Sequence, residues 1–353
     1  MKATTIYAAR DVRLENQPDP SIQKPTDAIV KVVAACVCGS DLWYYRGDNP
    51  ITAPFRIGHE FVGVIQEVGS AVRSLHKGDF VIAPFMYSDN TCPNCRVGIQ
   101  SACSAGGFWG GPDRDGLMAD GGQGEYIRVP LADGTLVATR EDPDAARVPS
   151  LLALSDVMGT GWHAATSAGV QEGDTVVVVG DGAVGDGAVG LSGVLAASRM
   201  GAGRVVAMSR HEERQKIARS FGATDVIAER GEAGEAAILE LTGGVGADAV
   251  LECVGTSQSM TTAITIARPG ATVGYVGVPH GIELPVRSMF SRNVGVAGGI
   301  APVRQYLPAL RDDVLSGAIN PGLVFDLALP LDKVAEGYAA MDERRAIKTM
   351  LRP

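Results

Sequence analysis

Hydrophobic positions in the first 150 residues follow the period of β-strands. Short apolar or alternating runs occur at 28–35, 60–67 and 79–83, and turn signals such as Lys77-Gly78-Asp79 separate them. Runs of this length between glycine and charged residues are typical of strands. The segment 104–123 is rich in glycine, and we expect an irregular loop there, close to a functional site. The N-terminal part is therefore predicted to be β-rich.

From about residue 173 the pattern changes to strands that alternate with helices. Helical stretches are expected at 191–200 and 212–221. The expected strands are 176–179, 204–208, a short one near 226, 249–253 and finally 271–278, which closes the series. This alternation predicts a parallel sheet built from βαβ units. The C-terminal part mixes a helix at 303–315, an amphipathic stretch at 331–341 and a terminal strand at 346–351.

Composition narrows the class of protein. A chain of 353 residues with 46% hydrophobic and 20% charged positions is long enough for about two folded domains. The formal charge is 31 − 40 = −9, and no long basic stretch occurs, which argues against nucleic-acid binding. No apolar run approaches the roughly 20 residues of a membrane span, and no signal peptide is apparent. We expect a soluble, cytoplasmic protein without a membrane or nucleic-acid partner.

A duplicated glycine motif follows the first strand of the alternating part. The hexapeptide GDGAVG occupies 180–185 and again 185–190, and both copies match G-x-G-x-x-G. After a strand and before a helix, this pattern predicts a loop that binds the pyrophosphate of a dinucleotide. A glycine-rich turn without a ligand is the alternative. The candidate cofactor-binding glycines are Gly180, Gly182, Gly185, Gly187 and Gly190.

The helix after this motif is expected to begin in the second copy. A helix that began in the first copy would carry three glycines in its interior, at about 1 kcal/mol each. We therefore favour a lengthened loop. Ser209-Arg210 follow the second strand, where an acidic residue favours NAD and an arginine suits the 2′-phosphate of NADP. These two residues predict a preference for NADP(H), with an ordinary solvated arginine as the alternative.

The chain has six cysteines, and some of them lie close together in sequence. Clustered thiols outside small secreted proteins are more typical of metal sites than of disulfides. Cys38 lies in Cys38-Gly39-Ser40-Asp41, and His59 lies in Gly58-His59-Glu60. A thiolate and an imidazole are natural zinc ligands, but two ligands do not define a site. A single cysteine or histidine is more often a core residue.

Four ordered motifs together resemble the zinc-dependent medium-chain alcohol dehydrogenases. These are the Cys38–Asp41 and Gly58–Glu60 motifs, the stretch SDVMGTGWH at 155–163 and the glycine-rich fingerprint. The resemblance extends over essentially the whole chain. It implies an α/β protein with a GroES-like β-rich catalytic domain at 1–153, completed by 300–353, and a Rossmann doubly wound parallel sheet at 154–299. It also implies a homodimer or homotetramer.

The resemblance implies a catalytic zinc held by Cys38, His59 and Asp156, with a fourth position left open. Glu60 matches a carboxylate that can approach the metal as an alternate ligand. Asp41 matches a carboxylate that fixes the tautomer of the ligand histidine.

Ser40 matches the first hydroxyl of the proton relay in this family. Many relatives continue the relay through a histidine three residues further on, but this chain has Trp43 there. The relay is therefore expected to run through ribose and water or through another group. Val278, at the end of the last expected strand, matches a position that borders the nicotinamide.

A second cluster matches the structural-zinc lobe of the family in its spacing. Its residues are Asp89, Cys92, Cys95 and Cys103, with an aspartate where the family normally has cysteine. A zinc-bound lobe and a metal-free or partly oxidised lobe both stay open. Lys348 matches a basic position near the pyrophosphate, with a surface lysine as the alternative.

These expectations predict an oxidoreductase that transfers hydride between the nicotinamide of NADP(H) and a zinc-bound alcohol or carbonyl. Its substrate would be a small alcohol, aldehyde or ketone. One alternative is a zinc-free quinone or enoyl reductase of the same fold, against which the three expected ligands argue. Another is a catalytically impaired dinucleotide-binding protein, which the duplicated motif keeps open.

Overall fold

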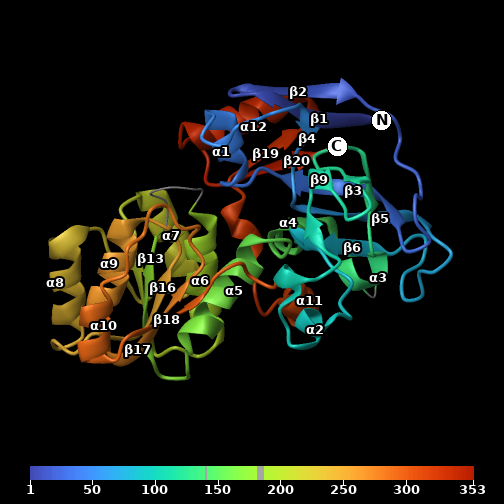
Figure 1. The fold of residues 1–353 in the computed structure, drawn as a ribbon. Helices are drawn as coiled ribbons and strands as arrows, with labels where there is room; N and C mark the ends of the chain where they lie inside the picture. The colour runs from blue at the N-terminus through green and yellow to red at the C-terminus, as the bar shows by residue number, and fades with distance from the viewer. Residues whose placement is uncertain (140, 181–186) are drawn as a thin grey trace. The chain divides into compact units, whose positions relative to one another are not determined.

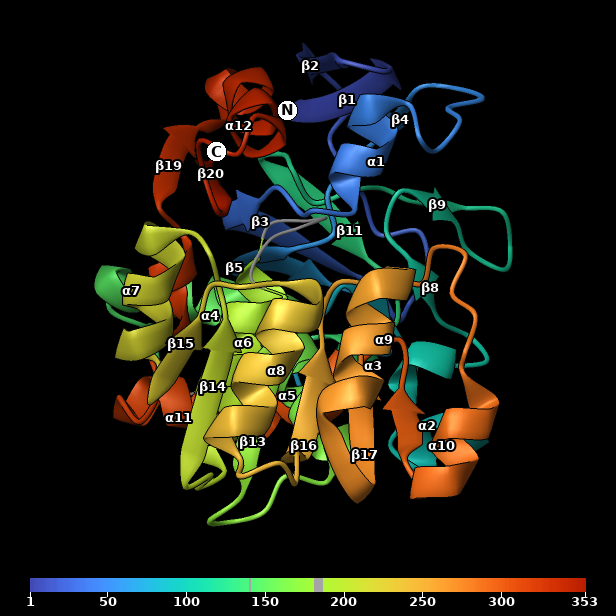
Figure 2. The ribbon, with the colours of Figure 1, turned by 90° about the vertical axis from the view of Figure 1, so that its left-hand side faces the viewer.

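The computed structural model describes residues 1–139, 141–180 and 187–353. The chain forms two compact units, and Figures 1 and 2 label the elements of each. We call Met1–Asp156 together with Pro302–Pro353 the split unit, and Val157–Ala301 the central unit.

The split unit is built around a seven-stranded sheet with β3 (Ala28–Cys36) at its centre. Strand β5 (Phe61–Val68) pairs with β3 along one edge. The opposite edge is shared, because β11 (Tyr126–Val129) pairs with the first half of β3 and β20 (Thr349–Arg352) with its end. The sheet is completed by β6 (Phe80–Ala83), β12 (Val137–Ala138) and β19 (Leu327–Pro330). The C-terminal segment is thus part of the N-terminal sheet.

Smaller elements surround this sheet. A three-stranded sheet contains β2 (Asp11–Asn16), β1 (Lys2–Ala8) and β4 (Phe55–Arg56), and two-stranded sheets pair β7 (Met86–Tyr87) with β8 (Gly107–Phe108) and β9 (Gly111–Pro112) with β10 (Met118–Ala119). The helices are α1 (Asp41–Arg46), α2 (Pro93–Arg96), α3 (Ala132–Thr135), α4 (Val148–Ala153), α11 (Val303–Ser316) and α12 (Val334–Asp342), with 3-10 turns η1 (Gln100–Ala102), η2 (Ala145–Arg147), η3 (Pro321–Val324) and η4 (Leu331–Lys333). The expected irregular loop at 104–123 therefore contains three short strands.

The central unit is a six-stranded sheet in which all described pairs are parallel. Its order is β15-β14-β13-β16-β17-β18, which is the doubly wound arrangement. The strands are β13 (Thr175–Val179), β14 (Arg204–Met208), β15 (Asp225–Ile227), β16 (Ala247–Glu252), β17 (Ala267–Tyr275) and β18 (Gly295–Gly298). The helices are α5 (Val157–Ala168), α6 (Ala188–Arg199), α7 (Glu212–Ser220), α8 (Gly231–Leu241), α9 (Ser257–Ile266) and α10 (Val286–Arg292). Helices α5 and α6 cover one face of the sheet, and α8 and α9 cover the other (Figure 1).

This architecture confirms the predicted α/β class with a parallel sheet. One detail of the prediction was wrong, because β17 does not close the series and β18 follows it. The β-branched run of β13 is almost wholly buried between the two helical layers, as a central parallel strand requires. Among the described residues, no helix combines the length and the apolar character needed to cross a bilayer.

Helix α6 begins at Ala188, inside the second copy of the duplicated motif. Gly187 precedes it with a φ of 74°, a left-handed conformation that favours glycine. The helix start agrees with the expectation from glycine propensity. Gly182 and Gly185 lie outside the described residues, so which copy contacts a pyrophosphate stays a prediction.

Candidate metal centres and cofactor site

Cys38, His59, Glu60 and Asp156 form what we call the first cluster, all within the split unit. One potential ligand atom from each lies within 4.8 Å of the others. Cys38 follows β3, and His59 and Glu60 precede β5. Because Ala35 of β3 pairs with Phe61 of β5, these segments meet at one end of the sheet. Asp156 joins them from the segment after α4.

The spacing within the first cluster suits a tetrahedral ion. Oδ2 of Asp156 lies 3.7 Å from Sγ of Cys38 and 3.4 Å from Nε2 of His59. Zinc bonds of about 2.0–2.3 Å place tetrahedral ligand atoms roughly 3.3–3.8 Å apart. The side chains of His59 and Asp156 are 17% and 13% exposed, so the cluster is largely but not wholly shielded from solvent. One thiol, one imidazole and carboxylates form a donor set that zinc accepts.

A buried chain of polar side chains backs His59 on the side away from Asp156. Oδ1 of Asp41 lies 3.4 Å from Nδ1 of His59, and Oδ2 of Asp41 accepts from the amide of Cys38 at 3.0 Å. Nε2 of Gln123 donates to Oδ2 of Asp41 at 3.3 Å and to the carbonyl of Cys36 at 3.1 Å. The hydroxyl of Tyr338 donates to Oε1 of Gln123 at 3.0 Å. Asp41 was expected here from the sequence, but Gln123 and Tyr338 were not.

The turn before His59 requires a glycine. Gly58 has a φ of 104°, and a Cβ at this position would lie 2.4 Å from Cγ of Gln123. A side chain here would therefore push Gln123 away from Asp41. The absence of a side chain at Gly58 therefore leaves the space that Gln123 occupies.

The pKa values of Cys38 and His59 indicate how protonation of the first cluster would be coupled to binding of a metal cation. Burial raises the pKa of Cys38 to about 12, although nearby His59 acts against this. Burial acts to lower the pKa of His59, but Cys38 and Asp41 outweigh it and hold the pKa well above its ordinary value. Zinc binds the thiolate and the neutral imidazole, so metal binding at this cluster is coupled to proton release.

Glu60 and Lys348 form a fully buried ion pair next to the first cluster. Nζ of Lys348 donates to Oε1 of Glu60 at 2.7 Å and to the carbonyl of Val37 at 3.2 Å. Both side chains are 0% exposed. Burial raises the pKa of Glu60, and the lysine counteracts that rise. The alternative of a surface position for Lys348 was wrong, because strand pairing of β20 with β3 places this side chain inside the unit.

Ser40 lies two residues after Cys38 as the N-cap of α1, and its side chain is partly exposed. Trp43 lies in the same helix. Another neighbour of the cluster, Phe85, has its ring 6.4 Å from that of His59 in an edge-on arrangement. Phe85 also stacks on Phe108 at 6.2 Å. Phe85 was not expected from the sequence, where its only signal is its position two residues after β6.

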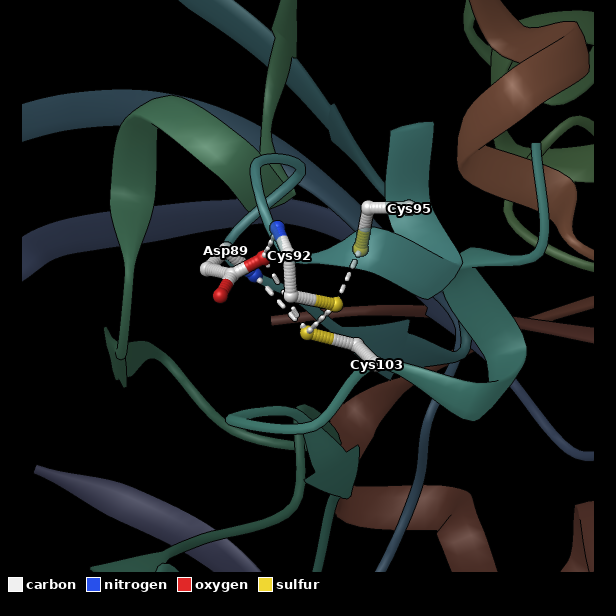
Figure 3. A group of neighbouring side chains, drawn as sticks. All are labelled: Asp89, Cys92, Cys95 and Cys103. Atoms are coloured by element: carbon white, nitrogen blue, oxygen red, sulfur yellow. Dashed lines mark hydrogen bonds between the residues drawn. The ribbon is translucent and has the colours of Figure 1, made fainter. Parts of the chain in front are cut away.

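Asp89, Cys92, Cys95 and Cys103 form what we call the thiol cluster, and their side chains point toward one another (Figure 3). Sγ of Cys92 lies 3.5 Å from that of Cys95 and 4.0 Å from that of Cys103. The amide of Ser104 donates to Sγ of Cys92 and lowers the pKa of this thiol to about 6. These separations match those of a tetrahedral thiolate site.

Asp89 contributes to the thiol cluster through one oxygen. Its Oδ1 accepts from the amides of Thr91 at 2.8 Å and Cys92 at 3.0 Å, and it lies 3.3 Å from Sγ of Cys103. The carboxylate therefore anchors the loop that carries the first thiol. Figure 3 shows that its second oxygen points away from Cys92.

The candidate cofactor residues of the central unit lie at the carboxyl edge of its sheet. Gly180 directly follows β13 with a φ of 111°, and a Cβ there would lie 2.2 Å from Val254. Ser209 follows β14 and is buried, and its carbonyl accepts from Gln215 at 2.8 Å. Arg210 is exposed, and Gly190 lies inside α6. Val278 is 51% exposed.

Known proteins resemble this chain over its full length. Residues 24–142 match the alcohol dehydrogenase GroES-like domain, and residues 188–314 match the zinc-binding dehydrogenase domain. A probable zinc-binding alcohol dehydrogenase of Mycobacterium tuberculosis is 36% identical over 358 residues, covering 100% of this chain and 89% of the relative. Zinc-type alcohol dehydrogenase B of Aspergillus flavus is 33% identical over 362 residues, covering 100% of this chain and 81% of the relative.

Among solved structures, the alcohol dehydrogenase of Thermus sp. ATN1 superposes with a TM-score of 0.90 at 31% identity, covering 100% of this chain and 99% of that one. The chain therefore belongs to the zinc-dependent medium-chain dehydrogenase family. This confirms the resemblance and the fold class inferred from sequence. It also places the protein among the oxidoreductases that act on alcohols.

Proposed function

We propose that this protein is a zinc-dependent alcohol dehydrogenase and carbonyl reductase that prefers NADP(H), and that Cys38, His59 and Asp156 hold its catalytic zinc. The proposal rests on one observation, which is the convergence of these three donor atoms from distant segments at ligand spacing. When bound, zinc supplies a Lewis acid for the substrate oxygen, and the nicotinamide accepts or gives the hydride. The alcohol loses one hydride and one proton in the oxidative direction.

Residues of the chain have separate tasks in this proposal. Asp41 faces Nδ1 of His59 and leaves Nε2 free for the metal. Ser40, at the start of α1, accepts the hydroxyl proton of the substrate and passes it on. Because Trp43 cannot relay a proton as a histidine does, a proton on Ser40 would leave through water, through the ribose of a bound cofactor or through another group. Phe85 offers an apolar surface beside the metal site.

The main experiment measures NADPH oxidation with a panel of aldehydes and ketones, before and after treatment with a chelator. We expect activity that the chelator abolishes and zinc restores. Cys38→Ala should lose activity and catalytic zinc together, whereas Cys253→Ala, outside both clusters, should retain its zinc. Activity that survives complete zinc removal would support the alternative of a zinc-free quinone or enoyl reductase. A metal-loaded protein without activity on any alcohol or carbonyl would support the non-catalytic alternative.

The preference for NADP(H) is carried by Ser209 and Arg210 at the end of β14. Arg210 is exposed where it can neutralise a 2′-phosphate, and a charge-assisted hydrogen bond of this kind contributes about 1.5–3 kcal/mol. We expect Arg210→Ser to raise the KM for NADPH about tenfold or more and to change the KM for NADH little. Arg219→Ser, an exposed arginine of α7, is the matched control. A wild-type preference for NADH would end this part of the proposal.

The thiol cluster is proposed to hold a second, structural zinc. Three thiols and one carboxylate at these separations are a closed donor set, as structural zinc requires. The inferred domains, 1–153 with 300–353 for catalysis and 154–299 for the dinucleotide, belong to the same proposal. Assembly into two or four copies and a cytoplasmic location stay predictions from sequence, to be measured by light scattering and cell fractionation.

A further inference from the structure

The buried ion pair between Glu60 and Lys348 has an asymmetry that bears on the first cluster. Oε1 of Glu60 accepts from Nζ of Lys348 at 2.7 Å. Oε2 of Glu60 is buried, and it has no hydrogen-bond partner in the described ranges 1–139, 141–180 and 187–353. Glu60 also offers one of the four potential ligand atoms of the first cluster, which lie within 4.8 Å of one another. One oxygen is therefore held by the lysine, while the carboxyl group stands within reach of the metal position.

The fold fixes the lysine firmly in this place. Lys348 precedes β20, whose Met350 pairs with Cys36 of β3, and Glu60 precedes β5 on the other side of β3. Nζ also donates to the carbonyl of Val37, directly before Cys38. Asp326 anchors the backbone of this segment, because its carboxylate accepts from the amides of Ile347 at 2.8 Å and Lys348 at 3.2 Å.

A buried carboxylate needs a compensating positive charge, since an unpaired one is strongly unfavourable. A metal in the first cluster would compete with the ammonium of Lys348 for the carboxylate of Glu60. While Lys348 is present, the ion pair satisfies the carboxylate at its observed position. Without Lys348, the metal becomes the remaining partner, and coordination by Glu60 becomes favourable.

We propose that Lys348 is a positioning residue that holds Glu60 off the metal and thereby keeps one coordination position open for substrate. This inference rests on the proposed function of the first cluster. It assigns Lys348 a task within the split unit, distinct from the pyrophosphate contact that the family resemblance implied. A purely structural ion pair would stabilise the fold without influencing coordination.

Cobalt(II) in place of zinc tests the inference, because its visible d–d bands report the number and type of ligands. The chain is loaded with cobalt, and the signal of the thiol cluster is removed by subtracting the spectrum of identically treated Cys38→Ala. We expect Lys348→Met to change the bands and to slow release of this metal to a chelator by about tenfold or more. Lys348→Arg should keep the wild-type spectrum because it keeps the positive charge.

The double variant Lys348→Met with Glu60→Gln should return the spectrum and the release rate to wild-type values, since the added ligand is gone. Glu60→Gln alone should leave both unchanged, and this arm can overturn the inference even when Lys348→Met does not fold. Faster metal release from Glu60→Gln would show that Glu60 is already a ligand and would overturn the inference. So would a Lys348→Met protein with the wild-type spectrum and release rate.

Different results would reject the proposed metal site and the proposed role of Lys348. A wild-type protein whose cobalt spectrum does not depend on Cys38 lacks the metal site, and the proposed function fails. A Cys38-dependent spectrum that does not respond to Lys348→Met leaves the metal site intact and rejects only the role of Lys348.

Discussion

The carboxylate of Asp41 lies 3.4 Å from Nδ1 of His59, opposite the imidazole nitrogen that faces Asp156 at the same distance. The imidazole is thus held between two carboxylates of the split unit, Asp41 behind the first cluster and Asp156 within it. Asp41 is itself fixed by the amide of Cys38 and by Gln123. The orientation of His59, a proposed metal ligand, therefore depends on Asp41 and on the residues that hold Asp41 in place.

Asp41→Asn should weaken zinc binding at the first cluster about tenfold, because the neutral amide orients and polarises His59 less well. The measurement is competition for zinc between the protein and a chromophoric chelator. Asp79→Asn is a matched control, since Asp79 lies 3.7 Å from Nδ1 of exposed His76 and away from both clusters. Equal zinc affinity in the two variants would mean that Asp41 does not act through His59.

Gln123→Leu should lower the free energy of unfolding by about 1–3 kcal/mol, because it leaves buried polar groups of Tyr338 and Asp41 without their partner. Urea unfolding of the metal-loaded protein, followed by fluorescence, measures the effect. Gln171→Leu removes an exposed glutamine of the same size and should change stability by less than about 0.5 kcal/mol. If Gln123→Leu lowers the free energy of unfolding no more than this control does, the buried hydrogen-bond network does not stabilise the fold.

Much of the fold could be predicted from sequence where side-chain pattern and local structure agree. The strand expected at 204–208 is β14 to the residue, and the helix expected at 212–221 is α7 within one residue. Strand β18 was missed because Gly295-Val-Ala-Gly298 is short and glycine-rich, a pattern that is typical of a turn. Pairing with β17, not local propensity, makes it a strand.

In the candidate site, too, some residues could be predicted from the sequence and others could not. Cys38, His59 and Asp156 carry recognisable motifs, so their convergence could be expected before the structure was known. Gln123 and Tyr338 could not, because neutral residues far apart in sequence have no spacing that marks them. Lys348 offered one unused signal, a lone lysine among the apolar residues Ala346, Ile347 and Met350 at the start of a strand.

Asp89→Asn should reduce zinc retention by the thiol cluster while the fold survives. The amide oxygen still accepts from the amides of Thr91 and Cys92, but the ligand loses its charge. After mild chelation, zinc analysis should find this variant with less metal than the wild type, at the level of a Cys92→Ser protein. Asp48→Asn, at an exposed position outside the cluster, should retain the wild-type amount. Full zinc retention by Asp89→Asn would mean that the three thiols hold the metal without help from the carboxylate.

Stability should depend on pH through His163, which lies in α5 of the central unit. Burial lowers the pKa of this imidazole below its ordinary value near 6.5. The unfolded chain therefore binds a proton at a higher pH than the folded chain does. As pH falls below about 6.5, the unfolded state gains protons first, and the folded state loses stability relative to it. Above that pH both states are neutral, and His163 contributes no pH dependence.

Thermal unfolding of the wild type and His163→Gln between pH 5 and 7.5 measures this effect. The difference in Tm should shift in favour of His163→Gln as the pH is lowered through 6.5, because glutamine cannot be protonated. His76→Gln removes an exposed histidine of the split unit and is the matched control for the loss of one imidazole. A His163→Gln curve parallel to that of the wild type across the whole range would show that burial at this position does not disfavour the charged imidazole.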